Sequence, residues 1–260
     1  MAKSLFIAPS TLNSGLTSVS LGLVRALDQI GVRVGFFKPI TQVSNIERTT
    51  ELSTHFAKQI CNIETPKPIS IIEAEAYLNR GERNLLMEKI VGVYQSFQQN
   101  FDVIIVEGLV PEENTPFSNK LNADIANNLN AEVILVADAK GMSYEALDKH
   151  LKTAAGVFSS SEDPDILGCI LNKVTLPDES NETETLLFES DSAQVVTNNH
   201  KDINTKKNYL SGCSVFTPKF KLLGEIPLDP TLIAPRTEDI VSECGLEILN
   251  EGELNDRRVL

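Results

Sequence analysis

The fold is decided by one stretch near the start of the sequence, LFIAPSTLNSGLTS (residues 5–18). Its first four residues, Leu5 to Ala8, are apolar and predict a short buried strand. A polar, turn-forming segment leads to Gly15, and beyond it apolar residues recur at helical spacing as far as Ile30. Strand, polar loop, glycine and helix in this order predict a loop that binds phosphate, because the first N–H groups of such a helix point at whatever lies in front of it.

The loop departs from the pattern of catalytic phosphate-binding loops. That pattern, G-x-x-x-x-G-K-[ST], holds the phosphates with backbone N–H groups, places its lysine on the β/γ oxygens and binds Mg²⁺ through its hydroxyl. When the two are aligned on Gly15 and Thr17, Ser10 stands at the first glycine and Leu16 at the lysine. Leucine offers no cation to a γ-phosphate, whose transfer depends on electrostatic stabilisation. A tight strand-to-helix turn, with Thr17 and Ser18 near the N-cap, is the simpler alternative.

The rest of the chain alternates short apolar runs with longer segments of helical spacing. Five more runs predict strands: Val32–Phe37, Val103–Val106, Val133–Ala137, Ile166–Leu171 and Leu222–Ile226. Most are apolar on both faces, as parallel strands buried between helices require. The sequence therefore predicts an α/β fold, with a doubly wound, mostly parallel sheet of the P-loop NTPase type.

Composition narrows the classes of partner. Lys and Arg number 23 and Asp and Glu 36, so the formal net charge is −13, which argues against nucleic acid or an anionic membrane surface. The four cysteines are far apart and form no C-x-x-C pair, which favours reduced thiols over disulfides or zinc. No apolar run approaches the roughly 18 residues of a membrane helix. We expect a soluble cytoplasmic protein with a small-molecule partner.

We expect one domain, residues 1–249, with a polar insertion. From Asp178 to Lys219 the chain is rich in polar residues, which predicts a long, partly disordered surface segment with one short helix near Leu186–Phe188. Asp229 to Leu249 is weakly helical. The polar tail, residues 250–260, is typical of a linker toward a further domain.

Polar residues at the carboxyl ends of predicted strands extend the candidate site, because ligands of open α/β sheets bind at that edge. Lys38 follows the second strand, although an exposed lysine that closes a strand is an equal alternative. Glu107 ends an apolar strand at the place where P-loop proteins hold Mg²⁺, and Gly108 lets the backbone turn close to a ligand. Asn172 and Lys173 end another strand where related folds read a nucleobase, or form a simple turn.

Pro227 closes the last strand and could border a base pocket. The predicted ligand-binding residues are Thr11, Asn13, Ser14, Gly15, Leu16, Thr17, Ser18, Lys38, Glu107, Gly108, Asn172, Lys173 and Pro227. Thr17 and Glu107 are the candidates for Mg²⁺. No residue is predicted to be catalytic.

These strings together resemble the N-terminal region of long bacterial phosphate acetyltransferases. The resemblance rests on GLTSVSLGL (15–23), FKPI (37–40), VEGLVP (106–111), LNK (171–173) and GEIP (224–227). NEGELNDRRV (250–259) resembles the join to that enzyme's DRTGG-type middle domain. The region is in turn similar to dethiobiotin synthetase, an ATP-dependent ligase that keeps the loop lysine. In the acetyltransferase version leucine is common at that position, as Leu16 is here.

The resemblance implies that acetyl transfer between acetyl-CoA and phosphate belongs to a catalytic domain absent from this sequence. It implies a role in sensing metabolites and in assembling a homo-oligomer of the full-length enzyme. No cofactor is then required, and ATP with Mg²⁺ or NADH would act as an effector. Two alternatives stay open: an active ligase of the dethiobiotin synthetase type, against which Leu16 argues, and a structural module whose loop binds nothing.

Overall fold

A six-stranded parallel sheet forms the centre of the computed structural model, which describes residues 2–42, 51–112, 115–158, 166–175, 213–248, 250, 252, 254 and 257–259. The strand order is β2-β5-β1-β6-β7-β8, and every neighbouring pair is parallel. The bounds are β1 Lys3–Pro9, β2 Val34–Phe37, β5 Val103–Glu107, β6 Glu132–Asp138, β7 Ile166–Val174 and β8 Lys221–Pro227. All six predicted strands are confirmed. A second, two-stranded sheet of β3 (Ile40–Thr41) and β4 (Ile69–Ser70) was not predicted.

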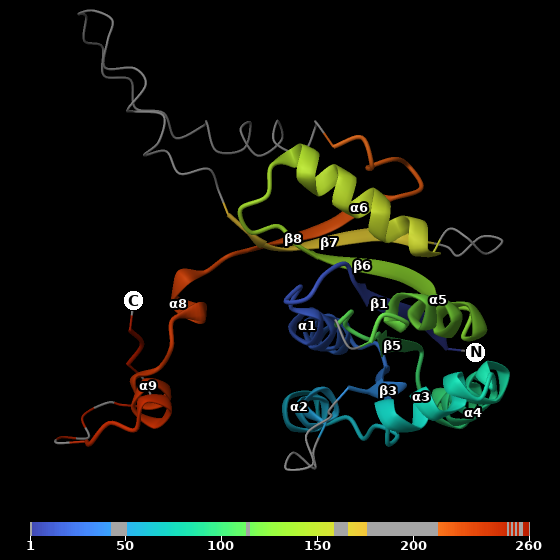
Figure 1. Cartoon of the computed structure of the whole chain (residues 1–260), viewed down its shortest axis with the longest axis horizontal. Coiled ribbons are helices and arrows are strands. Elements are labelled where there is room, and N and C mark those ends of the chain that lie inside the picture. Colours follow the sequence, from blue (N-terminus) through green and yellow to red (C-terminus); the bar gives the residue numbers. More distant parts are fainter. Residues whose placement is uncertain are drawn as a thin grey trace, which may run out of the picture.

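Helices cover both faces of the sheet, which confirms the doubly wound class (Figure 1). Alternate residues of a strand point to opposite faces, so Phe6 and Ala8 of β1 belong to one core cluster and Ile7 to the other. Residues of α1 (Leu16–Gln29) and α2 (Leu52–Cys61) join Ile7. The cluster of Phe6 takes residues from α3 (Ile71–Asn79), α4 (Arg83–Phe97), α5 (Ser118–Asn128) and α6 (Tyr144–Phe158). A 3-10 turn, η1 (Gln98–Asn100), follows α4.

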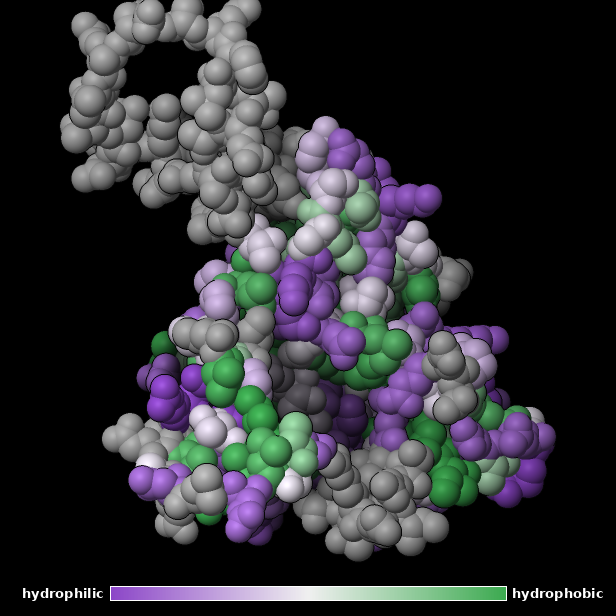
Figure 2. Space-filling model, turned by 60° about the vertical axis from the view of Figure 1, so that its left-hand side comes forward, coloured by the Kyte–Doolittle hydropathy of each residue, from purple (hydrophilic) through white to green (hydrophobic). Residues whose placement is uncertain are grey.

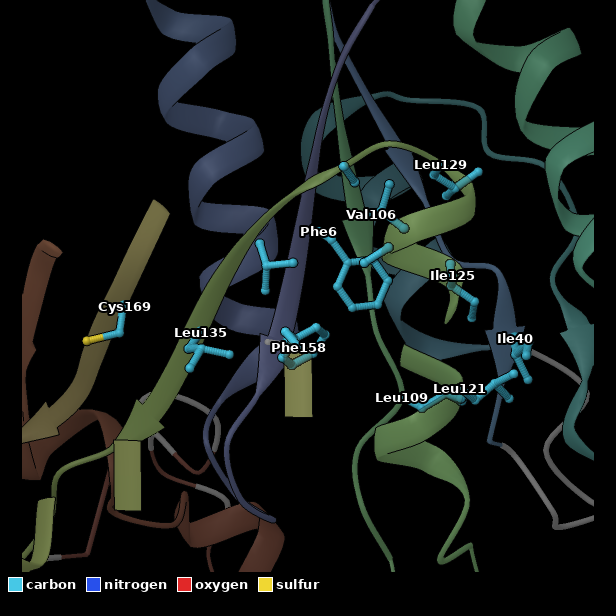
Figure 3. Packing of buried hydrophobic residues seen from close by; sticks show 14 of the residues in the cluster. Phe6, Ile40, Val106, Leu109, Leu121, Ile125, Leu129, Leu135, Phe158 and Cys169 are labelled. Atoms are coloured by element: carbon cyan, nitrogen blue, oxygen red, sulfur yellow. The ribbon is translucent and has the colours of Figure 1, made fainter. Parts of the chain in front are cut away.

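The larger cluster has Phe6 near its centre (Figure 3). The ring of Phe6 lies 6.4 Å from the ring of Phe158 on α6, measured between centroids, and close to Val106 on β5. Phe6 and Val106 have no exposed surface. Fully burying one such side chain contributes about 1.5–3 kcal/mol, so this cluster accounts for much of the favourable side of the stability.

The order of the strands places a switch point at β1. From β1 the chain crosses to β2 on one side of the sheet and later to β6 on the other, so β1 lies between β5 and β6. Open α/β sheets bind ligands in the crevice beyond the carboxyl ends of the strands at such a point. The loop that follows β1, residues 10–15, occupies this position.

The C-terminal segment lies apart from the sheet (Figure 1). Two short helices, α8 (Pro230–Ile233) and α9 (Thr237–Cys244), occupy part of the weakly helical stretch. The chain then returns, and the N–H of Val259 donates to the carbonyl of Pro235 at 2.9 Å. In Figure 1 the carboxyl ends of the strands lie on the side toward α8. Figure 2 brings that side forward and shows hydrophobic patches interspersed with hydrophilic ones.

Most of the predicted polar insertion, with the helix expected near Leu186–Phe188, lies outside the described residues. Its last part, from Cys213 to Lys219, is described, and both Cys213 and Val215 are buried in the core. None of the helices in the described ranges is long and apolar enough to span a membrane.

The four cysteines are free thiols with very different surroundings. Burial raises the pKa of the Cys169 thiol to about 12, whereas Cys244 is exposed. Because only the thiolate reacts, a pKa near 12 leaves a thiolate fraction of ~10⁻⁴ at pH 8. We expect iodoacetamide at pH 8 to modify Cys244 first and Cys169 only after unfolding, as peptide mass spectrometry over time would show. Equal rates at the two positions would contradict the packing of β7.

Candidate functional site

The loop between β1 and α1 has the backbone of an anion-binding turn. The N–H of Ser10 donates to the carbonyl of Val136 at 2.9 Å, which anchors the start of the loop on β6. Asn13 (φ 60°) and Gly15 (φ 77°) are left-handed. Gly15 is the N-cap of α1, and no side chain caps the helix. The first N–H groups of α1 therefore keep their partial positive charge available for a ligand.

Gly15 is required by its neighbour on β7. A Cβ atom at this position would lie 2.2 Å from Nδ2 of Asn172. That same Nδ2 donates to the carbonyl of Ser14 at 2.9 Å, and Oδ1 accepts from the N–H of Lys173 at 2.9 Å. Asn172, predicted to read a nucleobase, is brought to the loop as expected, but its amide here holds the loop backbone.

Lys173 lies beside the same loop. It has a left-handed backbone (φ 57°), and its ammonium donates to the carbonyl of Asn13 and, at 2.9 Å, to Oδ2 of Asp138. Asp138 ends β6, the strand next to β7, and we predicted no role for it. The loop thus has a cation on this side, already paired with a carboxylate.

A buried ion pair lies on the other side of the loop. Nζ of Lys38 is 2.8 Å from Oε1 of Glu107 and 2.8 Å from the carbonyl oxygen of Gly108. The side chains are 5% and 1% exposed. The alternative of an exposed lysine is therefore wrong, because β2 and β5 are neighbours and their carboxyl ends bring the two side chains together below the surface.

Glu107 also connects the ion pair to α1. Its Oε1 accepts from Ser53 Oγ at 2.7 Å and from Thr17 Oγ1 at 3.3 Å, and the two hydroxyls are 3.1 Å apart. Its Oε2 is buried and has no hydrogen-bond partner. Thr17 and Glu107, the two predicted magnesium ligands, therefore meet. Ser53 lies in the first turn of α2 and carried no sequence signal, since no motif surrounds it.

Gly108 is tightly enclosed. A Cβ atom there would lie 3.0 Å from Oδ1 of Asn122 and 3.0 Å from the ring of Phe6. Asn122, which sequence reasoning missed, accepts from the N–H of Leu109 and donates to its carbonyl, both at 2.8 Å. These contacts hold the segment after β5 in place beside the ion pair.

The remaining predicted residues divide into buried and exposed ones. Ser14 is 1% exposed, and its hydroxyl, like that of Thr11, is buried without a hydrogen-bond partner. Leu16 is 4% exposed and packs in the α1 core cluster. Ser18 is exposed on α1. Pro227 is exposed at the end of β8, the third strand from β1.

Comparison with known proteins identifies the family. A family model described as an AAA domain matches residues 3–236. The chain belongs to this family. This AAA domain is 34% identical over 259 residues to the phosphate acetyltransferase of Haemophilus influenzae, covering 99% of this chain and 35% of that protein. It is 36% identical over 257 residues to the phosphate acetyltransferase of Pseudomonas putida, covering 99% and 34%.

The AAA domain thus spans about a third of the length of these relatives and matches their N-terminal part. The resemblance that the sequence strings indicated is confirmed. Among solved structures, cobyrinic acid a,c-diamide synthase from Mycobacterium smegmatis with a bound ATP analog and magnesium gives a TM-score of 0.46 at 15% identity, covering 72% of this chain and 78% of that one.

Proposed function

We propose that this chain is a regulatory and assembly domain of a phosphate acetyltransferase, and that its loop, residues 10–15, binds a phosphate-bearing small molecule without turning it over. In the parent reaction acetyl-CoA and phosphate give acetyl phosphate and CoA. The proposal assigns that reaction to a part of the enzyme outside this sequence. Homo-oligomer formation through the full-length enzyme belongs to the same proposal and rests on the family resemblance.

The observation that carries binding is the buried hydroxyl of Ser14, which has no partner although it directly precedes the uncapped N-terminus of α1. A buried polar group without a hydrogen bond costs about 1–3 kcal/mol. Because this hydroxyl lies at the uncapped end of α1, a ligand bound there would remove that cost. A phosphoryl oxygen would accept from the hydroxyl and from the first N–H groups of the helix together.

The charges around the loop support binding without catalysis. Leu16 lies in the core, and the two lysines beside the loop are already paired, Lys38 with Glu107 and Lys173 with Asp138. Phosphoryl transfer needs a cation placed on the transferring group. No cofactor is required by this proposal, and ATP, with or without Mg²⁺, or NADH is the effector to test.

Replacement of Gly15 tests the loop. We expect calorimetry to detect ATP or NADH binding to the wild type, and Gly15→Ala to weaken that binding by at least about tenfold, equivalent to 1.4 kcal/mol, because the new methyl group displaces Asn172. Gly22→Ala is the matched control, since a Cβ atom there meets nothing within 4 Å. Unchanged binding in a folded Gly15→Ala protein, or no binding of either ligand to the wild type, would remove the loop from the proposal.

A second candidate function is ATP-dependent ligation of the dethiobiotin synthetase type. One observation favours it: Lys38 shares the oxygen of Glu107 with Thr17, so a cation does lie near the loop. ATP turnover dependent on Mg²⁺ and a diamino acid, clearly above that of a Thr17→Ala control, would establish the ligase and exclude a non-catalytic domain.

A further inference from the structure

We infer that Lys38 takes the place of a divalent cation at this loop, so that the phosphate-bearing ligand binds in metal-free form. The inference rests on the proposed function and makes it more specific, because it names the ionic state of the ligand. The observation behind it is that one oxygen of Glu107 already accepts hydrogen bonds from Lys38, Ser53 and Thr17.

The ligands expected for Mg²⁺ fit the ion poorly. Magnesium is bound in near-ideal octahedral geometry by oxygen atoms at about 2.0–2.1 Å, and it keeps several waters. Oε1 of Glu107 already accepts from Lys38, Ser53 and Thr17. A magnesium ion on this oxygen would have to displace an ammonium that is 2.8 Å away.

The ammonium of Lys38 is held in place and cannot move aside for a magnesium ion without losing a second hydrogen bond. It is also bonded to the carbonyl of Gly108 at 2.8 Å, and the Lys38 side chain is 5% exposed. Moving it would leave that carbonyl without its donor and would place a second positive charge in a buried site beside the first. Oε2 of Glu107 is buried without a hydrogen-bond partner, and the test therefore includes a magnesium arm.

The same geometry places the positive charge of Lys38 near the loop. One carboxylate oxygen joins Nζ of Lys38 to the hydroxyl of Thr17, and Thr17 lies in the first turn of α1. A phosphoryl group in front of that turn would accept hydrogen bonds from the first N–H groups of the helix. It would also be attracted by the positive charge of Lys38. In this way Lys38 would supply, for binding only, part of the positive charge that a loop lysine and Mg²⁺ supply together elsewhere.

The experiment is a titration of this chain with ATP and, separately, with inorganic pyrophosphate, each in excess EDTA and in excess MgCl₂. We expect the wild type to bind at least as tightly in EDTA as in MgCl₂. Glu107→Gln should tighten binding in EDTA by about tenfold, because the ammonium loses a negatively charged partner. Lys38→Met should weaken binding in EDTA by about tenfold or more, and Lys38→Arg should restore part of it.

The outcomes separate the two proposals. Binding that appears only with MgCl₂ and disappears in Glu107→Gln overturns the inference and leaves the proposed function intact. Binding in neither condition overturns the proposed function itself. Since Lys38→Met leaves Glu107 buried and unpaired, the double variant Lys38→Met/Glu107→Gln, which carries no charge at either position, keeps the test valid. We expect it to fold and to bind more tightly than Lys38→Met, which keeps the carboxylate charge, but more weakly than the wild type. Wild-type affinity in this variant would contradict the role of Lys38.

Discussion

Replacing Gly168 with alanine should destabilise the domain by about 3 kcal/mol or more, because two backbones meet at this residue. Gly168 has a φ of 151°, which L side chains rarely adopt, and a Cβ atom there would lie 1.9 Å from the carbonyl oxygen of Lys221 on β8. Backbone atoms of a paired strand have little freedom to retreat. Accommodating the methyl group would therefore push β8 away from β7. Because β8 is the edge strand, this side of the sheet would lose its outermost strand.

Urea unfolding followed by circular dichroism would measure this loss. The matched control is Gly92→Ala, an exposed helical position in α4 where a Cβ atom meets nothing within 4 Å. There alanine should stabilise by about 0.5–1 kcal/mol, because glycine is the poorer helix former. If both variants had the same unfolding midpoint, the pairing of β7 with β8 at this residue would be wrong.

The second large effect is expected for Lys38→Met. Removing one partner of a buried ion pair leaves an uncompensated charge and typically costs about 3–5 kcal/mol. Here the loss falls on Glu107, whose carboxylate is 1% exposed and would keep only hydroxyl donors, from Ser53 and Thr17. The carbonyl of Gly108 would lose its donor from the same ammonium.

Denaturant unfolding of a double-mutant cycle measures that cost. Lys38→Met/Glu107→Gln should recover a large part of the stability lost in Lys38→Met, since no buried charge remains. The exposed pair Arg33–Asp102 serves as the comparison, because its charges are solvated, and breaking it with Arg33→Met should lower the stability far less than Lys38→Met does. Equal losses in Lys38→Met and Arg33→Met would show that the Lys38–Glu107 pair is not buried.

Much of the fold was predictable because burial on both faces leaves a clear pattern. Strands such as Val103–Glu107 read as continuous apolar runs, and α1 as a helix with one apolar side. The two-residue strands β3 and β4 were not predicted, because a pairing of two residues has no periodicity. They form because the folded chain brings Ile40–Thr41, just after β2, alongside Ile69–Ser70.

The candidate site was predictable where residues end strands. Lys38, Glu107 and Asn172 all come at carboxyl ends, which parallel strands bring to one edge. Ser53 and Asn122 were missed, because they project from helices far from the loop in sequence and belong to no motif. Their roles depend on the direction in which a folded helix presents them.

By itself the sequence determined the fold class, the strand-loop-helix unit around Gly15 and the absence of a lysine at Leu16, because each of these depends on local pattern. Only the tertiary structure decided which side chains of the site form hydrogen bonds and ion pairs with one another. It buried Lys38 against Glu107, placed the amide of Asn172 on the carbonyl of Ser14 and left the hydroxyl of Ser14 without a partner. These are relations between residues up to 158 positions apart, and burial gives them their energy. Periodicity shows which side chains are buried, but it carries no information on which of them meet.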